Sequence, residues 1–452
     1  MLKLATTLVV VALVPARAAA QATEAWQAPT LSITRYDEDW SDLVDAEKRG
    51  HHWTGRFKYI PIRGDAWLST GIELRARAED YKNNLWGGAD APDDAYLWVR
   101  AVPYADVHVD RFRAFVQPVL AYAVGVQPAA SPVDQTRADL LQGFGELDLG
   151  AVTLRAGRQM LSLGTERLVG TRYGPNVPLA FDGFRGIVRV GSADVSLFAV
   201  KPVEPGPDSF DDKSSPTKAL WGAYATIPQL DFYYLGYRNR DAHFGGRPGR
   251  ELRHTLGARY HGARADWRWN LEAAGQFGSF ADERIGAWTV ATELGRKLST
   301  LPLSPDATLR FNIASGDSNP GDDRLGTFNA LFPKGKYFGE LSPIGPYNIV
   351  NLNPAVSLDL GRNLSLGVAA MAYWRFSRAD GVYDIPGHLI RAPGRSRARY
   401  IGKEAELTLA WQPTAELELS ASISAFQPGA FIRETGPAKA IGMFGLEANF
   451  RF

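Results

Sequence analysis

Residues 72–79 read Ile72-Glu73-Leu74-Arg75-Ala76-Arg77-Ala78-Glu79, a strict alternation of apolar and charged side chains. Successive side chains of a β-strand point to opposite faces, so this pattern places all the apolar groups on one face and all the charges on the other. The stretch therefore predicts a strand that has an apolar environment on one side and a polar one on the other.

The same alternation recurs along almost the whole chain after residue 65. We count about eighteen such segments, centred near residues 73, 101, 116, 145, 155, 186, 197, 222, 234, 256, 271, 290, 311, 354, 370, 405, 420 and 446. Most are roughly 9 to 14 residues long, which suits strands that cross a bilayer at a tilt.

The connections between these segments alternate in length. Short turns follow the even-numbered strands, as at residues 110–111, 149–150, 361–363 and 412–414, and long Gly- and Pro-rich loops follow the odd-numbered ones, as at 160–181, 203–217, 316–345 and 377–397. Outer-membrane barrels have short periplasmic turns and long outer loops. The sequence therefore predicts an all-β fold, a single transmembrane antiparallel β-barrel of about 18 strands.

Composition excludes several other classes of protein. The 452 residues include no Cys, which rules out disulfides, thiolate metal sites and cysteine nucleophiles. A hydrophobic fraction of 45% with 22% charged residues excludes a disordered chain. No segment after the first twenty residues approaches 18 consecutive apolar residues, so a helical membrane protein is excluded.

The N-terminus has the pattern of an exported protein. Lys3 precedes the apolar run 4–14, and small residues surround Ala20 and Ala22. This pattern predicts a secretory signal peptide over residues 1–22. We expect an N-terminal periplasmic or plug-like segment over 23–64, a barrel over 65–452, and a location in the cell outer membrane of a Gram-negative bacterium.

The last strand carries apolar side chains at Phe444, Leu446, Ala448, Phe450 and Phe452. A terminal Phe after alternating apolar residues resembles the C-terminal strand that outer-membrane barrels present to the barrel-assembly machinery, so that machinery is an expected partner through Phe452. Aromatic residues at predicted strand ends are candidates for interfacial girdles, namely Tyr59, Trp67, Trp98, Trp221, Trp374 and Trp411.

If the apolar face meets lipid, the charged face lines a pore rich in arginine, because 38 of the 50 basic residues are Arg. Alternation places inward Arg75, Arg77, Arg113, Arg155, Arg253, Arg259, Arg268, Arg310 and Arg375. Guanidinium groups hold carboxylates through two parallel hydrogen bonds. The alternative is that these arginines pair across strands with inward acids such as Glu73 and Glu146.

Two segments contain sequence features that strand alternation does not explain. The first contains Gly157-Arg158-Gln159, the Arg-bearing loop 164–177, and Phe181-Asp182-Gly183-Phe184-Arg185; its loop could fold inward and narrow the pore. The second covers 326–339 in the longest predicted outer loop and reads Gly326-Thr327-Phe328-Asn329, followed by Leu331-Phe332-Pro333.

At these residues, and at 35–41 and 57–61, the sequence resembles the alginate export family of outer-membrane barrels, from about residue 34 to Phe452. The resemblance implies an 18-stranded monomer with an electropositive pore for the anionic polysaccharide alginate. The implied polyanion contacts are Arg75, Arg77, Arg113, Arg158, Arg167, Arg172, Arg185 and Arg310, with Asp182 and Glu73 orienting them.

The main hypothesis is a channel for diffusion or export of an alginate-like polyuronate, with periplasmic secretion proteins as possible partners. An uptake porin for small organic anions or sugars is the alternative. A barrel enzyme is disfavoured, because no recognisable Ser/His/Asp set or G-x-S-x-G motif is present. We expect no cofactor, no metal ion and no nucleic-acid partner: Asp317 to Asp323 lack the glutamate of a calcium loop, and the basic residues form no patch.

Overall fold

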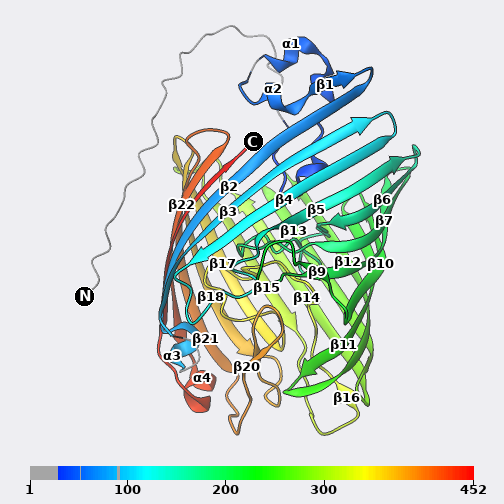
Figure 1. The fold of residues 1–452 in the computed structure, drawn as a ribbon. Coiled ribbons are helices and arrows are strands. Elements are labelled where there is room, and N and C mark those ends of the chain that lie inside the picture. Colours follow the sequence, from blue (N-terminus) through cyan, green and yellow to red (C-terminus); the bar gives the residue numbers. More distant parts are fainter. Residues whose placement is uncertain (1–28, 51, 89–91) are drawn as a thin grey trace.

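The computed structural model describes residues 29–50, 52–88 and 92–452, so the predicted signal peptide lies outside the described residues. Eighteen long strands form one closed antiparallel barrel (Figure 1). They are β2 (Ala66–Lys82), β3 (Asp94–Val109), β4 (Phe112–Val124), β5 (Arg137–Asp148), β6 (Val152–Gln159), β7 (Phe181–Val190), β8 (Ala193–Glu204), β10 (Lys218–Ile227), β11 (Leu230–Phe244), β12 (Arg247–Arg264), β13 (Trp267–Phe280), β14 (Glu283–Lys297), β15 (Asp306–Ala314), β17 (Ile349–Gly361), β18 (Leu364–Arg375), β21 (Tyr400–Trp411), β22 (Leu417–Pro428) and β23 (Ile441–Arg451).

The prediction of the strands is confirmed, because each expected centre falls inside one of these strands. The barrel closes where β2 pairs with β23, from Glu73 opposite Arg451 to Lys82 opposite Gly442. Among the described residues, closure gives every long strand a partner strand on both sides, which is the condition for placing a β-sheet in a bilayer.

The two ends of the barrel differ in their connections, as predicted, except for two tight hairpins at the long-loop end and the longer connection 298–305 between β14 and β15 at the short-turn end. Strands β11 and β12 are joined by Gly245 and Gly246, and β13 and β14 by residues 281–282, although long loops were expected there. Gly245 and Gly246 have φ of 57° and 80°, the backbone that a two-residue hairpin turn requires. In this sector the strands themselves are extended at the long-loop end of the barrel, and β12 reaches 18 residues.

The distribution of apolar and polar side chains in the barrel is the reverse of that in a soluble protein. On β2, Leu74 is 44% exposed and its neighbour Arg75 is 2% exposed. Trp411 faces outward, as expected for a girdle, but Trp98 is a correction, because it lies in the inward row of Arg100 and is 7% exposed. Apolar groups therefore face lipid, and polar groups face the lumen.

Short elements complete the fold. Three small strands join the main sheet, and β19 pairs with β20 in an outer loop. These elements are η1 (Arg35–Asp37), η2 (Ser41–Val44), α1 (Ala46–Arg49), α2 (Gly55–Lys58), β1 (Ile60–Arg63), α3 (Asn84–Gly87), β9 (Lys213–Ser214), β16 (Arg324–Leu325), β19 (Val382–Tyr383), β20 (Leu389–Arg391) and α4 (Ala430–Thr435). Within the described part of the chain, no helix combines the length and the apolarity needed to span a membrane.

The segment before β2 covers the end of the barrel that carries the short turns and the C-terminus (Figure 1). We call this the periplasmic end, following the rule for short turns. Lys58 is fully buried there and donates hydrogen bonds to the Tyr104 hydroxyl at 2.7 Å and the Thr70 carbonyl at 3.0 Å. Arg35 donates to the Phe452 carbonyl at 2.5 Å, so the segment is attached to both the first and the last strand.

Candidate pore lining and its inward loops

The loop between β6 and β7 folds into the barrel and is held by two arginines of the wall. Arg75 on β2 donates to the carbonyl oxygens of Tyr173, Gly174 and Pro175 at 2.7–3.1 Å. Arg100 on β3 donates to the carbonyl oxygens of Pro175 and Asn176 at 3.1 and 3.2 Å. The structure thus places Arg75 under the segment 173–176, which we call the clamped segment.

Glu73 orients this clamp. Its carboxylate accepts hydrogen bonds from Arg100 Nε and Nη2 at 3.1 and 2.7 Å and from the Tyr173 hydroxyl. Both Glu73 and Arg100 are buried. Residue types alone could not identify Arg100 as a clamp, because its partners are backbone groups that lie more than seventy residues away in the sequence.

Arg77 is the centre of a second network, which holds the loop between β15 and β17. It donates to Glu447 at 2.7 Å and to Glu340 of that loop at 2.6 Å, and it also contacts Glu79. Lys336 of the same loop donates to Glu79 and Glu340 at 3.1 and 2.6 Å. Two cations and three carboxylates share this network, so the charge of Arg77 is largely balanced.

The two inward loops also contact each other. Val169 and Phe332 form a parallel bridge, and the backbone N–H groups of Phe332 and Gly170 donate across it at 2.9 Å. Around the bridge lies an apolar core inside the barrel that includes Leu161, Phe181 and Ile344, all fully buried. The expectation that the first loop narrows the pore therefore agrees with its position.

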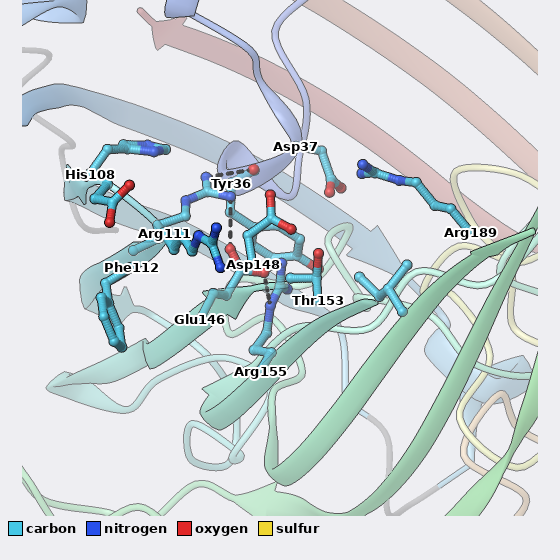
Figure 2. Close-up of a pocket in the computed structure, with 13 residues that line it drawn as sticks. Tyr36, Asp37, His108, Arg111, Phe112, Glu146, Asp148, Thr153, Arg155 and Arg189 are labelled. Carbon is cyan, nitrogen blue, oxygen red and sulfur yellow. Dashed lines mark hydrogen bonds and ion pairs between the residues drawn. The ribbon is translucent and has the colours of Figure 1, made fainter. Parts of the chain in front are cut away.

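The periplasmic mouth contains a pocket of about 360 Å³ beneath η1 (Figure 2). Arg113 and Arg155 both contact Glu146 there, at 3.1 and 2.6 Å. Tyr36 enters the pocket from η1, with the Arg155 guanidinium 4.0 Å from its ring centroid. Arg113 also donates to the Tyr36 carbonyl at 2.6 Å, so both arginines hold the N-terminal segment as well as an acid.

The wall from β11 to β15 carries further arginines in pairs. Arg310 donates to Glu293 at 2.7 Å and keeps a side chain that is 42% exposed. Arg268 likewise forms an ion pair, with Asp306 at 2.5 Å. Arg185 in β7 donates to the Ser196 hydroxyl at 2.8 Å and has no carboxylate within 4.0 Å among the described residues.

Arg158 and Asp182 require a correction, because they do not line the lumen. They pair across β6 and β7 in the alternate row that contains Leu154 and Phe184, which are 47% and 70% exposed to the outside. Arg158 donates to Asp182 at 2.8 Å. It is also three positions from inward Arg155, an odd spacing that puts the two on opposite faces of a strand.

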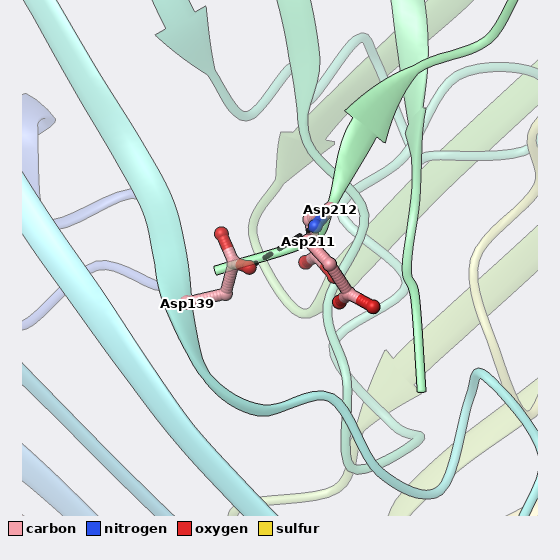
Figure 3. A group of neighbouring side chains, drawn as sticks. All are labelled: Asp139, Asp211 and Asp212. Carbon is pink, nitrogen blue, oxygen red and sulfur yellow. Dashed lines mark hydrogen bonds between the residues drawn. The ribbon is translucent and has the colours of Figure 1, made fainter. Parts of the chain in front are cut away.

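Arg158 lies where β5 and β6 diverge and the loop after β8 fills the gap. Its Nη1 is 3.5 Å from Asp139, which forms a group of three carboxylates with Asp211 and Asp212 (Figure 3). The backbone N–H of Asp212 donates to Asp139 at 3.1 Å. Because Arg158 already supplies a positive charge here, we infer no metal site from this group.

Three cations gather where the inward loops meet the wall, and we call Arg167, Arg310 and Lys334 the basic cluster. Arg167 donates to Asn312 at 2.7 Å and lies 3.5 Å from Glu272. Burial lowers the pKa of Lys334, and the charges of Arg167 and Arg310 lower it further. In the described ranges the Lys334 and Arg172 side chains have no carboxylate within 4.0 Å, a property that they share with Arg185.

Lys334 is a lumenal cation that strand alternation does not predict. Its loop was singled out, but a lysine in a loop has no alternation that would give its direction. The contact that positions it is the backbone N–H of Lys334, which donates to the Glu166 carbonyl of the other loop at 2.9 Å.

Comparison with known proteins identifies the family of this barrel. A family model described as alginate export matches residues 66–445, which is most of the chain. The chain belongs to the alginate export family. This family and the closed barrel are those of an outer-membrane channel. No curated protein matches the sequence significantly.

Solved porins share the fold of this alginate export family member. OccK2 (OpdF) of Pseudomonas aeruginosa, solved with glucuronate, is 12% identical with a TM-score of 0.56, and the match covers 85% of this chain and 98% of that one. OpdK of the same organism, solved with vanillate, has the same four values. A BenF-like porin from Pseudomonas fluorescens Pf-5 is 11% identical with a TM-score of 0.58, covering 87% and 100%. At these identities the likeness concerns the fold alone.

Proposed function

We propose that this channel conducts an anionic carbohydrate, an alginate-like polyuronate or its oligomers, past the basic cluster. The observation that carries the proposal is the position of Lys334, which lies beside Arg167 and Arg310 in the lumen. Its side chain forms no ion pair with a carboxylate in the described part of the chain. Cations that line a constriction are one way in which a pore selects anions. Family membership supports a uronate polymer as the solute.

Pairing divides the predicted contact residues into two groups. Arg75 and Arg77 act mainly by holding the loops in place, and Arg113 by holding the N-terminal segment. Arg167, Arg172, Arg185 and Arg310, together with Lys334, are the proposed solute contacts. Glu73 is a positioning residue, since its carboxylate is occupied by Arg100 and Tyr173.

The second candidate is an uptake porin for small organic anions. It is favoured by the two loops that narrow the lumen, because a narrow path suits a monomer better than a polymer. Two of the solved porins that share this fold contain glucuronate and vanillate, and both of these compounds are small carboxylates.

Planar bilayer recordings distinguish these functions. We expect polymannuronate to block the current at a lower concentration than mannuronate monomer, and the block to weaken about tenfold in Lys334→Ala with Arg310→Ala. The control is Arg268→Ala, which removes a wall arginine whose contacts are to Asp306 and Thr308. Block by monomer at equal or lower concentration would favour the uptake porin.

We also propose that the barrel works as a monomer, because its strand edges are consumed by closure. Residues 29–64 would then act as a cap on the periplasmic mouth. Secretion proteins and the assembly machinery would approach from this end.

A further inference from the structure

The outer wall carries a group of cations that the transport function does not use. Lys201 on β8, Arg238 and Arg240 on β11, and Arg250 on β12 are all exposed near the end with the long loops. We call these four residues the outer cationic band. Arg238 faces outward, because it lies in the alternate row of Phe232, which is 51% exposed.

Lys201 and Arg238 are level in the strand register, and Arg240 and Arg250 lie two residues nearer the hairpin between β11 and β12. Arg238 is opposite Ala219 of β10 on one side and Leu252 of β12 on the other. Lys201 is the residue that follows Val200, which pairs with Leu220, and so it lies level with Ala219. With neighbouring strands ~4.8 Å apart, Lys201 and Arg238 are separated by about 10 Å.

These cations lack partners within the protein. Among the residues that the structure describes, none of the four side chains has a carboxylate within 4.0 Å or an intramolecular hydrogen bond. The acid nearest to Lys201 across the strand pair is Asp182, which Arg158 already occupies at 2.8 Å. In the described sequence, two exposed acids lie next to the band, Asp241 beside Arg240 and Asp282 beside Ala281, whose backbone N–H donates to the Arg250 carbonyl.

An apolar groove lies on the same outward face, closer to the middle of the membrane. It has a volume of about 740 Å³ and is floored by small residues of β10, β12 and β13 between the larger Phe232, Leu256 and Trp288. Its floor includes Ala223, Ala225, Ala258, Ala273 and Gly275. A row with Trp221, His254 and Phe277 separates the groove from the band.

We propose that this sector, from β8 to β14, is a binding site for a phosphorylated, acylated glycolipid of the outer leaflet. The band binds the phosphates, and the groove accepts an acyl chain. Charge complementarity selects this occupant: exposed arginines that form no ion pair among the described residues suit phosphates, which guanidinium groups bind bidentately. The vertical order of cations, aromatic row and apolar groove matches the order of headgroup, interface and chain in a leaflet.

Native mass spectrometry of the folded barrel, titrated in mild detergent with bis-phosphorylated lipid A, tests the proposal. We expect one lipid A to be retained, and retention to fall at least tenfold in the variant Lys201→Glu, Arg238→Glu, Arg240→Glu, since each cation near an anionic headgroup contributes roughly fivefold. The charge-matched control is Lys82→Glu, Lys403→Glu, Lys439→Glu, which changes exposed cations at the same end of the barrel on the other side.

A second variant tests the groove without touching the band. A Cβ at Gly275 would meet no atom within 4 Å, so Gly275→Leu introduces a side chain into the groove from an unobstructed position. We expect it to weaken lipid A retention while the heat-modifiable shift of the folded barrel on gels stays normal. Unchanged retention in the band variant, an equal loss in the control, or equal retention of phosphatidylglycerol would each overturn the proposal.

Discussion

Replacing Arg75 and Arg100 together by alanine should free the clamped segment and widen the channel. Between them the two guanidinium groups make six hydrogen bonds of 2.7–3.4 Å to carbonyl oxygens of residues 173–176. The substitution also leaves buried Glu73 without its arginine. Removing one side of such a buried pair costs about 3–5 kcal/mol, which corresponds to an increase of roughly two to four powers of ten in the open population of the segment.

Single-channel recording measures this effect. We expect a larger and noisier conductance for the double variant, whereas Arg268→Ala, a wall arginine bonded to Asp306 and Thr308, should conduct like the wild type. The apolar core around Phe332 should keep the rest of the loop in place, so the barrel should still show its folded form on unheated gels. A conductance equal to that of the wild type would refute the clamp.

Three further outcomes follow from the contacts. Gly71→Val should undock residues 29–64, because a Cβ there would collide with the Phe452 carbonyl and lie 2.7 Å from Lys58 Nζ. Hydrogen exchange of the segment should therefore rise, and unchanged protection would contradict the docking. Burial, together with the charge of Arg35, lowers the pKa of Lys58 from 10.5 to about 7. Between these values the docked form binds fewer protons than the undocked form, so docking should strengthen as the pH rises from 7 to 10. Hydrogen exchange of the segment that increases over this range would contradict this pH dependence. Arg158→Ala should leave ion selectivity unchanged, since Arg158 lies in the row of the wall that does not face the lumen. A shift of the reversal potential in this variant would show that Arg158 does line the pore.

The strands could be predicted from the sequence because alternation is a local property. In a barrel with lipid outside and polar groups inside, nearly every strand must repeat the pattern of Ile72 to Glu79. The two tight hairpins were mispredicted for a local reason: Gly245 and Gly246 were visible, but the outward extension of β11 and β12 was not.

The candidate site was less predictable, because its contacts join distant segments. Alternation gives the face of Arg75 but not its partner, the backbone of residues 173–175. The error at Arg158 could have been avoided, since its odd spacing from Arg155 already indicates the opposite face. Lys334 could not have been chosen, because its position depends on a bond between two loops.

The role of the basic cluster is tested by the reversal potential across a planar bilayer with a tenfold KCl gradient, measured for the wild type and for Lys334→Glu. The wild type should prefer chloride, and the substitution, which places a carboxylate beside Arg167 and Arg310, should abolish or reverse this preference. A cation-selective wild type, or a reversal potential that the substitution leaves unchanged, would contradict the basic cluster as the anion contact of the channel.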